Sequence, residues 1–199
     1  MMLPKIRELV EAVKALAVGP YTSKFPRAMP EIPEGFRGAP RYHEEDCMGC
    51  ASCFNACPAQ AIDLADDVKA LKRTLTINHD RCIFCGQCQL HCPTEKGVML
   101  SKEWNLANTK REGTMKENVE HELAACEFCG AVIAPRKQIV WIAEKLGHLA
   151  YANPTLILEM IKSRKLPAAK ASESEKAVRR GDRLRVQCPA CRRESALII

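Results

Sequence analysis

Eight cysteines in the first half of the chain have a spacing that binds metal clusters. The run Cys-x2-Cys-x2-Cys-x3-Cys-Pro occurs twice, with its cysteines at Cys47, Cys50, Cys53 and Cys57 and then at Cys82, Cys85, Cys88 and Cys92. Thiolates at this spacing bind [4Fe–4S] clusters, and the fourth cysteine of each run binds the cluster of the other run. We therefore predict two clusters, one held by Cys47, Cys50, Cys53 and Cys92, the other by Cys82, Cys85, Cys88 and Cys57.

Four more cysteines lie near the C-terminus in two Cys-x2-Cys pairs, Cys126 with Cys129 and Cys188 with Cys191. Two such pairs are typical of a tetrahedral four-thiolate site, for which zinc is the preferred metal. The 58 residues between the pairs exceed the about 15–20 of a simple zinc ribbon. A rubredoxin-type iron is the alternative metal, since it uses similar cysteine pairs. Two metal-free cysteine pairs, with or without a redox role, are a further alternative.

The cysteine usage separates this chain from secreted disulfide proteins. All twelve cysteines fall into the metal-binding runs, and none is left over. The N-terminus reads Met-Met-Leu-Pro-Lys-Ile-Arg-Glu, whose charges interrupt the apolar stretch that a signal peptide needs. Because clusters need thiolates rather than disulfides, we expect a reducing, cytoplasmic location.

The formal charge of +6 counts every cysteine as neutral. Two clusters and one zinc with their thiolates would contribute about −6, which brings the loaded protein close to neutral. The basic residues near the C-terminus also lack interleaved aromatic residues for stacking on bases. We therefore expect no nucleic-acid partner.

Two segments precede the clusters. In residues 1–19, apolar residues from Ile6 to Ala17 recur at helical spacing, and Gly19-Pro20 ends the predicted helix. This amphipathic helix is too short and too charged to span a bilayer, so it packs on its own domain or lies along a membrane or a membrane-embedded partner. Residues 20–46 contain five prolines, which predict an extended arm or a disordered linker.

The remaining chain divides into residues 47–101, with the cluster runs, and residues 102–199. In the first part, a short helix follows each loop of three cysteines, and strands are expected at residues 61–64, 75–78 and 98–100 with a surface hairpin over 65–73. In the second part, helices are predicted over 101–125, 137–146 and 155–165, with a solvated linker over 167–182. The predicted fold class is α+β. His79 and His91 are interpreted as structural residues, with a role in proton-coupled reduction as the alternative.

The chain resembles the two-cluster subunit of respiratory complex I. The resemblance rests on the arm, which reads Tyr-Thr-Ser-Lys-Phe-Pro over residues 21–26 and Gly-Phe-Arg-Gly over 35–38, and on both cysteine runs. The C-terminal cysteine pairs are not part of that subunit. With Lys137-Gln138-Ile139 between them, they resemble the equivalent subunit of group 4 membrane-bound [NiFe] hydrogenases of the formate hydrogenlyase type.

This resemblance implies a bacterial ferredoxin-like core and a role as a one-electron relay. The upstream partner would be an iron–sulfur donor subunit or ferredoxin, and the downstream partners the hydrogenase small and large subunits. The subunit would lie on the cytoplasmic side of the membrane, peripherally, against membrane-embedded subunits. No catalytic residue carries over, so the chain is expected to be a non-catalytic subunit of an oxidoreductase. A complex I-like quinone- or antiporter-linked oxidoreductase is the alternative, although it leaves the C-terminal cysteines unexplained.

Overall fold

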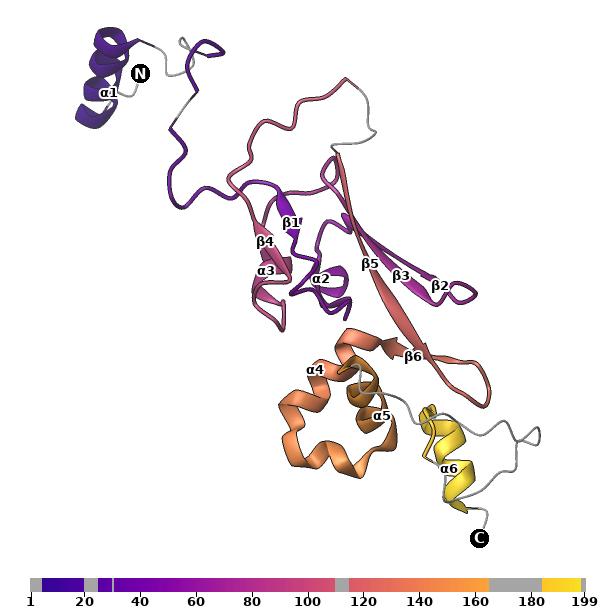
Figure 1. Ribbon diagram of the computed structural model, residues 1–199. Coiled ribbons are helices and arrows are strands. Elements are labelled where there is room, and N and C mark those ends of the chain that lie inside the picture. The colour runs from indigo at the N-terminus through magenta and orange to yellow at the C-terminus, as the bar shows by residue number, and fades with distance from the viewer. Residues whose placement is uncertain (1–4, 20–24, 30, 110–114, 165–183, 198–199) are drawn as a thin grey trace. The chain divides into compact units, whose positions relative to one another are not determined.

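The computed structural model describes residues 5–19, 25–29, 31–109, 115–164 and 184–197 (Figure 1). The chain divides into two compact units, Met1–Phe36 and Arg37–Ile199. The predicted linker over residues 167–182 lies outside the described residues. The predicted mixed helix-and-sheet fold is confirmed.

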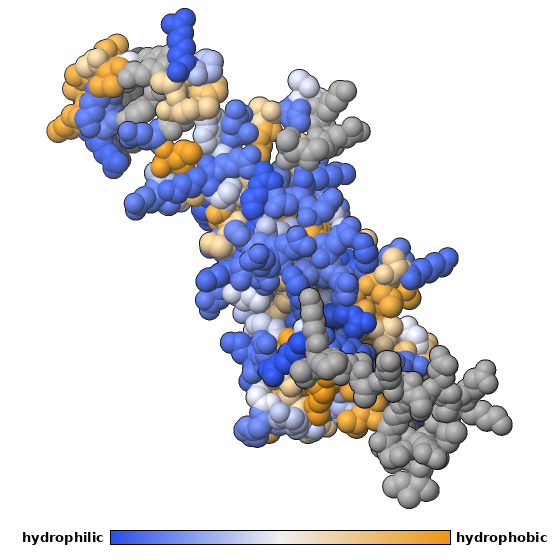
Figure 2. Space-filling model, viewed as in Figure 1, coloured by the Kyte–Doolittle hydropathy of each residue, from blue (hydrophilic) through white to orange (hydrophobic). Residues whose placement is uncertain are grey.

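The N-terminal unit contains helix α1 (Ile6–Val18), as predicted. Its apolar residues are exposed, with Ile6 at 83% and Leu16 at 88%, and no residue of α1 is buried. Figure 2 shows these hydrophobic residues in orange over α1, at the upper left. Across the part of the chain that the structure describes, no helix is both long and apolar enough to span a bilayer.

The second unit is built around two antiparallel sheets. Strand β1 (Pro40–Tyr42) pairs with β4 (Val98–Leu100) in a two-stranded sheet. The larger sheet has the order β2-β3-β5-β6, with β2 (Ile62–Asp67), β3 (Lys72–Asn78), β5 (Lys116–Ala125) and β6 (Val132–Pro135). Two short helices, α2 (Ser52–Ala56) and α3 (Gln87–Leu90), follow the cysteine loops. The three predicted strands and the hairpin are confirmed, although β2 and β3 extend into the predicted excursion.

The predicted helix over residues 101–125 is wrong. Residues 101–109 form no regular element, and residues 116–125 form strand β5, which pairs along β3 from Lys116 to Glu122. Side chains of a strand alternate between its two faces. Val119, His121 and Leu123 are accordingly buried, while the glutamates between them are exposed. The polar residues of this segment are the outward half of this alternation.

The hydrophobic core of the second unit contains cluster cysteines as well as aliphatic side chains. Leu75 and Ile77 of β3 are almost fully buried, and they pack with Val98, Val119 and Ile62. Cys47 and Cys53 belong to the same buried group. The sheet therefore supplies an apolar wall behind the cysteine loops.

The C-terminal part packs helices against the end of β5. Helices α4 (Arg136–Leu146) and α5 (Pro154–Ser163) match the two predicted helices, and a 3-10 helix η1 (Gly147–Ala152) joins them. Helix α5 begins at Pro154, and the side chain of Asn153 accepts a hydrogen bond from the Thr155 N–H at 3.1 Å, which caps the helix. Strand β6 and helix α6 (Pro189–Leu197) were not predicted, so the region 102–199 is mixed rather than purely helical.

Candidate iron–sulfur and metal centres

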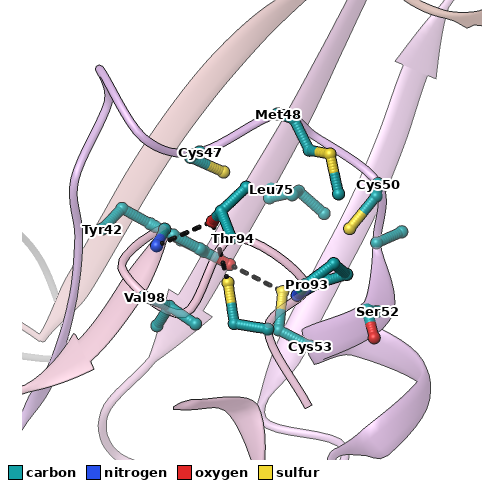
Figure 3. A pocket seen from close by; sticks show the side chains of 13 residues that line it. Tyr42, Cys47, Met48, Cys50, Ser52, Cys53, Leu75, Pro93, Thr94 and Val98 are labelled. Atoms are coloured by element: carbon teal, nitrogen blue, oxygen red, sulfur yellow. Dashed lines mark hydrogen bonds between the residues drawn. The ribbon is translucent and has the colours of Figure 1, made fainter. Parts of the chain in front are cut away.

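The first cavity lies between the loop of the first run and the chain that follows α3. Cys47, Cys50, Cys53 and Cys92 all line it, although Cys92 belongs to the second run. Figure 3 shows the sulfur atoms of Cys47, Cys50 and Cys53 around this cavity, with Leu75 and Val98 beside them. The structure therefore brings together four thiols that the spacing assigned to one cluster.

The second cavity repeats this arrangement with the exchanged cysteine. Its lining includes Cys57, Cys82, Cys85 and Cys88. Cys57 directly follows α2, whereas the other three cysteines lie in the second loop and α3. Each cavity therefore brings together three cysteines of one run and one cysteine of the other.

The two cysteine runs share a backbone conformation that explains their common spacing. Left-handed residues occur at three equivalent positions in the two runs: Gly49 and Phe84, Ala51 and Gly86, Gln60 and Glu95. This conformation is rare for residues other than glycine. It turns backbone N–H groups toward the sulfurs, as in the donation from the Phe84 N–H to Cys82 Sγ at 3.4 Å. Each run thus folds into the same loop around its cavity.

Free thiolates are unfavourable in these cavities. Burial raises the pKa of Cys47 and of Cys88 to about 11, with smaller contributions from the neighbouring sulfurs. Unmetallated thiols at these positions are therefore protonated at neutral pH, and a metal cluster must displace their protons. Four sulfur donors with an apolar wall around them fit a [4Fe–4S] cluster, whose ligands are thiolates. When bound, such a cluster supplies one-electron redox chemistry.

Polar side chains contact the sulfurs of the first set. His121 Nε2 lies 3.2 Å from Cys47 Sγ, Thr94 Oγ1 lies 3.3 Å from Cys92 Sγ, and Tyr42 Oη lies 3.8 Å from Cys53 Sγ. Burial raises the pKa of Tyr42 well above its usual value, and the nearby Cys53 adds to this effect, so the hydroxyl remains protonated. These three residues were not singled out in the sequence.

His121 is the most informative of the missed residues. Its position in β5 was hidden by the wrong helix prediction, although the alternation of Val119, His121 and Leu123 was a usable signal. Burial lowers the pKa of His121 to about 4, and the charge of Lys137 adds to this effect, so the imidazole is neutral. His79 instead lies within 3.1 Å of the Pro40 carbonyl oxygen, which agrees with a structural role.

The four C-terminal cysteines form a compact group. Their sulfur atoms all lie within 4.8 Å of one another, and Cys129 Sγ is 3.7 Å from Cys188 Sγ. A tetrahedral zinc with Zn–S bonds of about 2.3 Å requires sulfurs about 3.8 Å apart. The group is therefore the right size for a single metal ion. It was predicted from two pairs separated by 58 residues, which the fold brings together.

Backbone groups prepare this site for a cation. Burial opposes ionisation of Cys126, but the backbone N–H groups of Cys129, Cys188 and Phe128 outweigh it and lower the pKa of Cys126 to about 6. Hydrogen bonding with Cys129 and Cys188 raises the pKa of Cys191 to about 12, so this thiol keeps its proton until a metal replaces it. The Arg185 guanidinium lies over the Phe128 ring at 5.0 Å, which joins the two halves of the site.

Comparison with known proteins gives consistent matches. The 4Fe-4S dicluster domain family matches residues 39–96. Formate hydrogenlyase subunit 6 of Escherichia coli (strain K12) is 33% identical over 135 residues, which cover 68% of this chain and 74% of that protein. NADH-quinone oxidoreductase subunit I 2 of Geobacter metallireducens is 32% identical over 120 residues, which cover 56% of this chain and 91% of that protein. NAD(P)H-quinone oxidoreductase subunit I of Gloeobacter violaceus is 24% identical over 162 residues, which cover 72% of this chain and 77% of that protein.

Proposed function

This chain belongs to the family that includes formate hydrogenlyase subunit 6 and subunit I of NADH-quinone oxidoreductase, and on that premise we propose that it relays single electrons through two [4Fe–4S] clusters. The observation that carries the proposal is the pair of cavities, each lined by one of the two crossed sets of four cysteines. Buried aliphatic side chains pack against the cysteines and give the clusters an apolar wall. The chain itself provides ligands and hydrogen bonds for the clusters, and covalent bonds of the substrate are made and broken in partner subunits.

The partners follow from the family. The chain passes electrons from an upstream iron–sulfur donor subunit or ferredoxin to the small subunit of a membrane-associated hydrogenase, which delivers them to the large subunit. It lies peripherally on the cytoplasmic side, against membrane-embedded subunits. Two features support this assignment: the 33% identity to formate hydrogenlyase subunit 6, and the four-cysteine group beyond the dicluster domain. The exposed apolar face of α1 supports contact with a partner or a membrane.

The same proposal covers the organisation of the chain. It assigns an amphipathic helix to the segment 1–19, an arm that leads into strand β1 to 20–46, the ferredoxin domain to 47–101, and to 102–199 a C-terminal region that a zinc ion closes. The sulfur distances at Cys126, Cys129, Cys188 and Cys191 support zinc as a single tetrahedral ion. A rubredoxin-type iron would use the same four ligands.

A complex I-like quinone- or antiporter-linked oxidoreductase is the second candidate. The match that covers 91% of NADH-quinone oxidoreductase subunit I 2 favours it. Both candidates use the two clusters as an electron relay, and they differ in the enzyme that the relay serves.

Iron content tests the electron relay. The full chain, purified without oxygen, is expected to contain about eight irons in two cubanes, because each crossed set binds one [4Fe–4S] cluster. Chemical iron and sulfide analysis, together with EPR of the reduced protein, measures this. A content of about four irons would contradict the two-cluster assignment.

The composition of the native complex separates the two candidates. An affinity tag on this chain is expected to isolate a membrane complex that contains nickel and evolves or consumes hydrogen. Metal analysis and a hydrogen assay of the isolated complex measure this. A complex without nickel that reduces a quinone would favour the complex I-like alternative.

A further inference from the structure

We propose that His121 raises the reduction potential of the cluster held by Cys47, Cys50, Cys53 and Cys92 by donating a hydrogen bond from its Nε2–H to Cys47 Sγ. The inference rests on the proposed function, since it needs the clusters to be present. In this proposal His121 acts on one cluster through the Cys47 sulfur, so the two clusters have different reduction potentials.

The contact is built into the fold. His121 lies in the middle of β5, opposite Arg73 of β3 in the sheet register. The residue is 4% exposed, and its Nε2 is 3.2 Å from Cys47 Sγ across 74 residues of sequence. Pairing with β3 fixes the backbone of His121, and Gly49 lies against its buried ring, so the approach to the sulfur is not a chance surface contact.

The surroundings of the ring decide which nitrogen carries the proton. His121 Nδ1 is buried, and it has no hydrogen-bond partner among the described residues. A neutral imidazole has one N–H donor and one acceptor nitrogen. A proton on Nδ1 would bury an unpaired N–H, whereas a proton on Nε2 finds the Cys47 sulfur as its acceptor. A cluster-bound thiolate can only accept, so the bond runs from His121 to Cys47.

Gly49 makes room for the histidine. A Cβ atom at Gly49 would lie 2.7 Å from His121 Cδ2, which is too close for two carbon atoms. Phe84 occupies the equivalent position in the second run with a similar left-handed φ, 52° against 70°. The loop conformation therefore accepts a large side chain at this position. The glycine in the first run is explained by the ring packed against it.

The hydrogen-bond donors around the two sets of sulfurs differ. Both sets have backbone donors, such as the N–H groups of Ala61 to Cys57 and of Phe84 to Cys82 in the second set. Side-chain contacts with sulfur, from His121, Thr94 and Tyr42, occur only in the first set among the described residues. Thr94 Oγ1 also accepts from the Gly97 N–H, which leaves its own proton for Cys92.

The extra side-chain donors in the first set determine which cluster has the higher reduction potential. Reduction adds negative charge to a cluster, and hydrogen bonds to its sulfurs stabilise that charge, which raises the potential. The first cluster therefore holds the electron more strongly than the second. At equilibrium a single electron on the chain resides mainly on the cluster beside His121.

The test is a potentiometric EPR titration of the full chain with both clusters assembled. In His121→Phe, the equilibrium constant for reducing one cluster is expected to fall about tenfold, since a hydrogen bond to a charged group is lost. For a one-electron couple this is a potential lower by about 59 mV. The other cluster in the same molecule is the internal control, and its potential should stay unchanged. His121→Gln, which keeps an N–H donor, should restore most of the shift.

A second measurement uses the unaltered chain, in case the variants lose their clusters. Pulsed EPR of the reduced protein with ¹⁵N-labelled histidine should detect a weak nitrogen coupling to one cluster and not to the other. Two results would overturn the proposal: unchanged or equally shifted potentials in His121→Phe, or the absence of any histidine coupling. Failure to assemble about eight irons in the unaltered chain would instead refute the proposed function.

Discussion

A Cys57→Ser chain is expected to lose the cluster bound by Cys82, Cys85 and Cys88 and to keep the other cluster. Cys57 belongs to the first run, but it directly follows α2 and lines the second cavity with those three cysteines. Serine is a poor substitute for a thiolate ligand of iron. The iron content should therefore fall from about eight to about four.

Cys92→Ser is the matched control for this experiment. Cys92 occupies the equivalent position in the second run and lines the first cavity with Cys47, Cys50 and Cys53. Its replacement should remove the cluster beside His121 and leave the other. EPR of the reduced variants distinguishes the two cases. Loss of the Cys47 cluster in Cys57→Ser would show that each run holds its own cluster.

A Cys188→Ser chain is expected to lose one zinc and the order of its C-terminal part. Structural zinc sites contribute about 10–16 kcal/mol to the folding of small domains. Here the metal would join Cys126, directly after β5, to Cys188 and Cys191 at the start of α6. Metal analysis should show zinc falling from about one per chain to none. Hydrogen exchange should show loss of protection in α6, while the iron content stays at about eight.

Ala190→Ser is the control for the zinc experiment. It introduces the same hydroxyl group at an exposed position between Cys188 and Cys191, so zinc should be retained. An unaltered chain that contains no zinc and about nine irons would show that the site binds a rubredoxin-type iron. Unchanged zinc in Cys188→Ser would show that the four cysteines do not form one site.

Helices were predicted correctly where their apolar residues follow a regular period. Helices α1, α4 and α5 have apolar residues at helical spacing, and each begins within a few residues of its predicted start. Strand β5 was missed because charged and polar residues alternate with its buried side chains, and pairing with β3 helps to bury Val119 and Leu123. A polar strand depends on the neighbouring strand for its stability. The residues of β5 alone do not show which strand will pair with it.

The sequence by itself determined the twelve cysteines, their division into two crossed sets and one group of four, and the family. Ligand spacing within a run is a local property of the chain, and the same short loop forms wherever that spacing recurs. Tertiary structure alone decided that His121 contacts Cys47 and that its ring packs against Gly49, where a side chain would clash. That contact joins residues 74 positions apart through the register of β5 on β3, and register depends on long-range packing that no local pattern encodes.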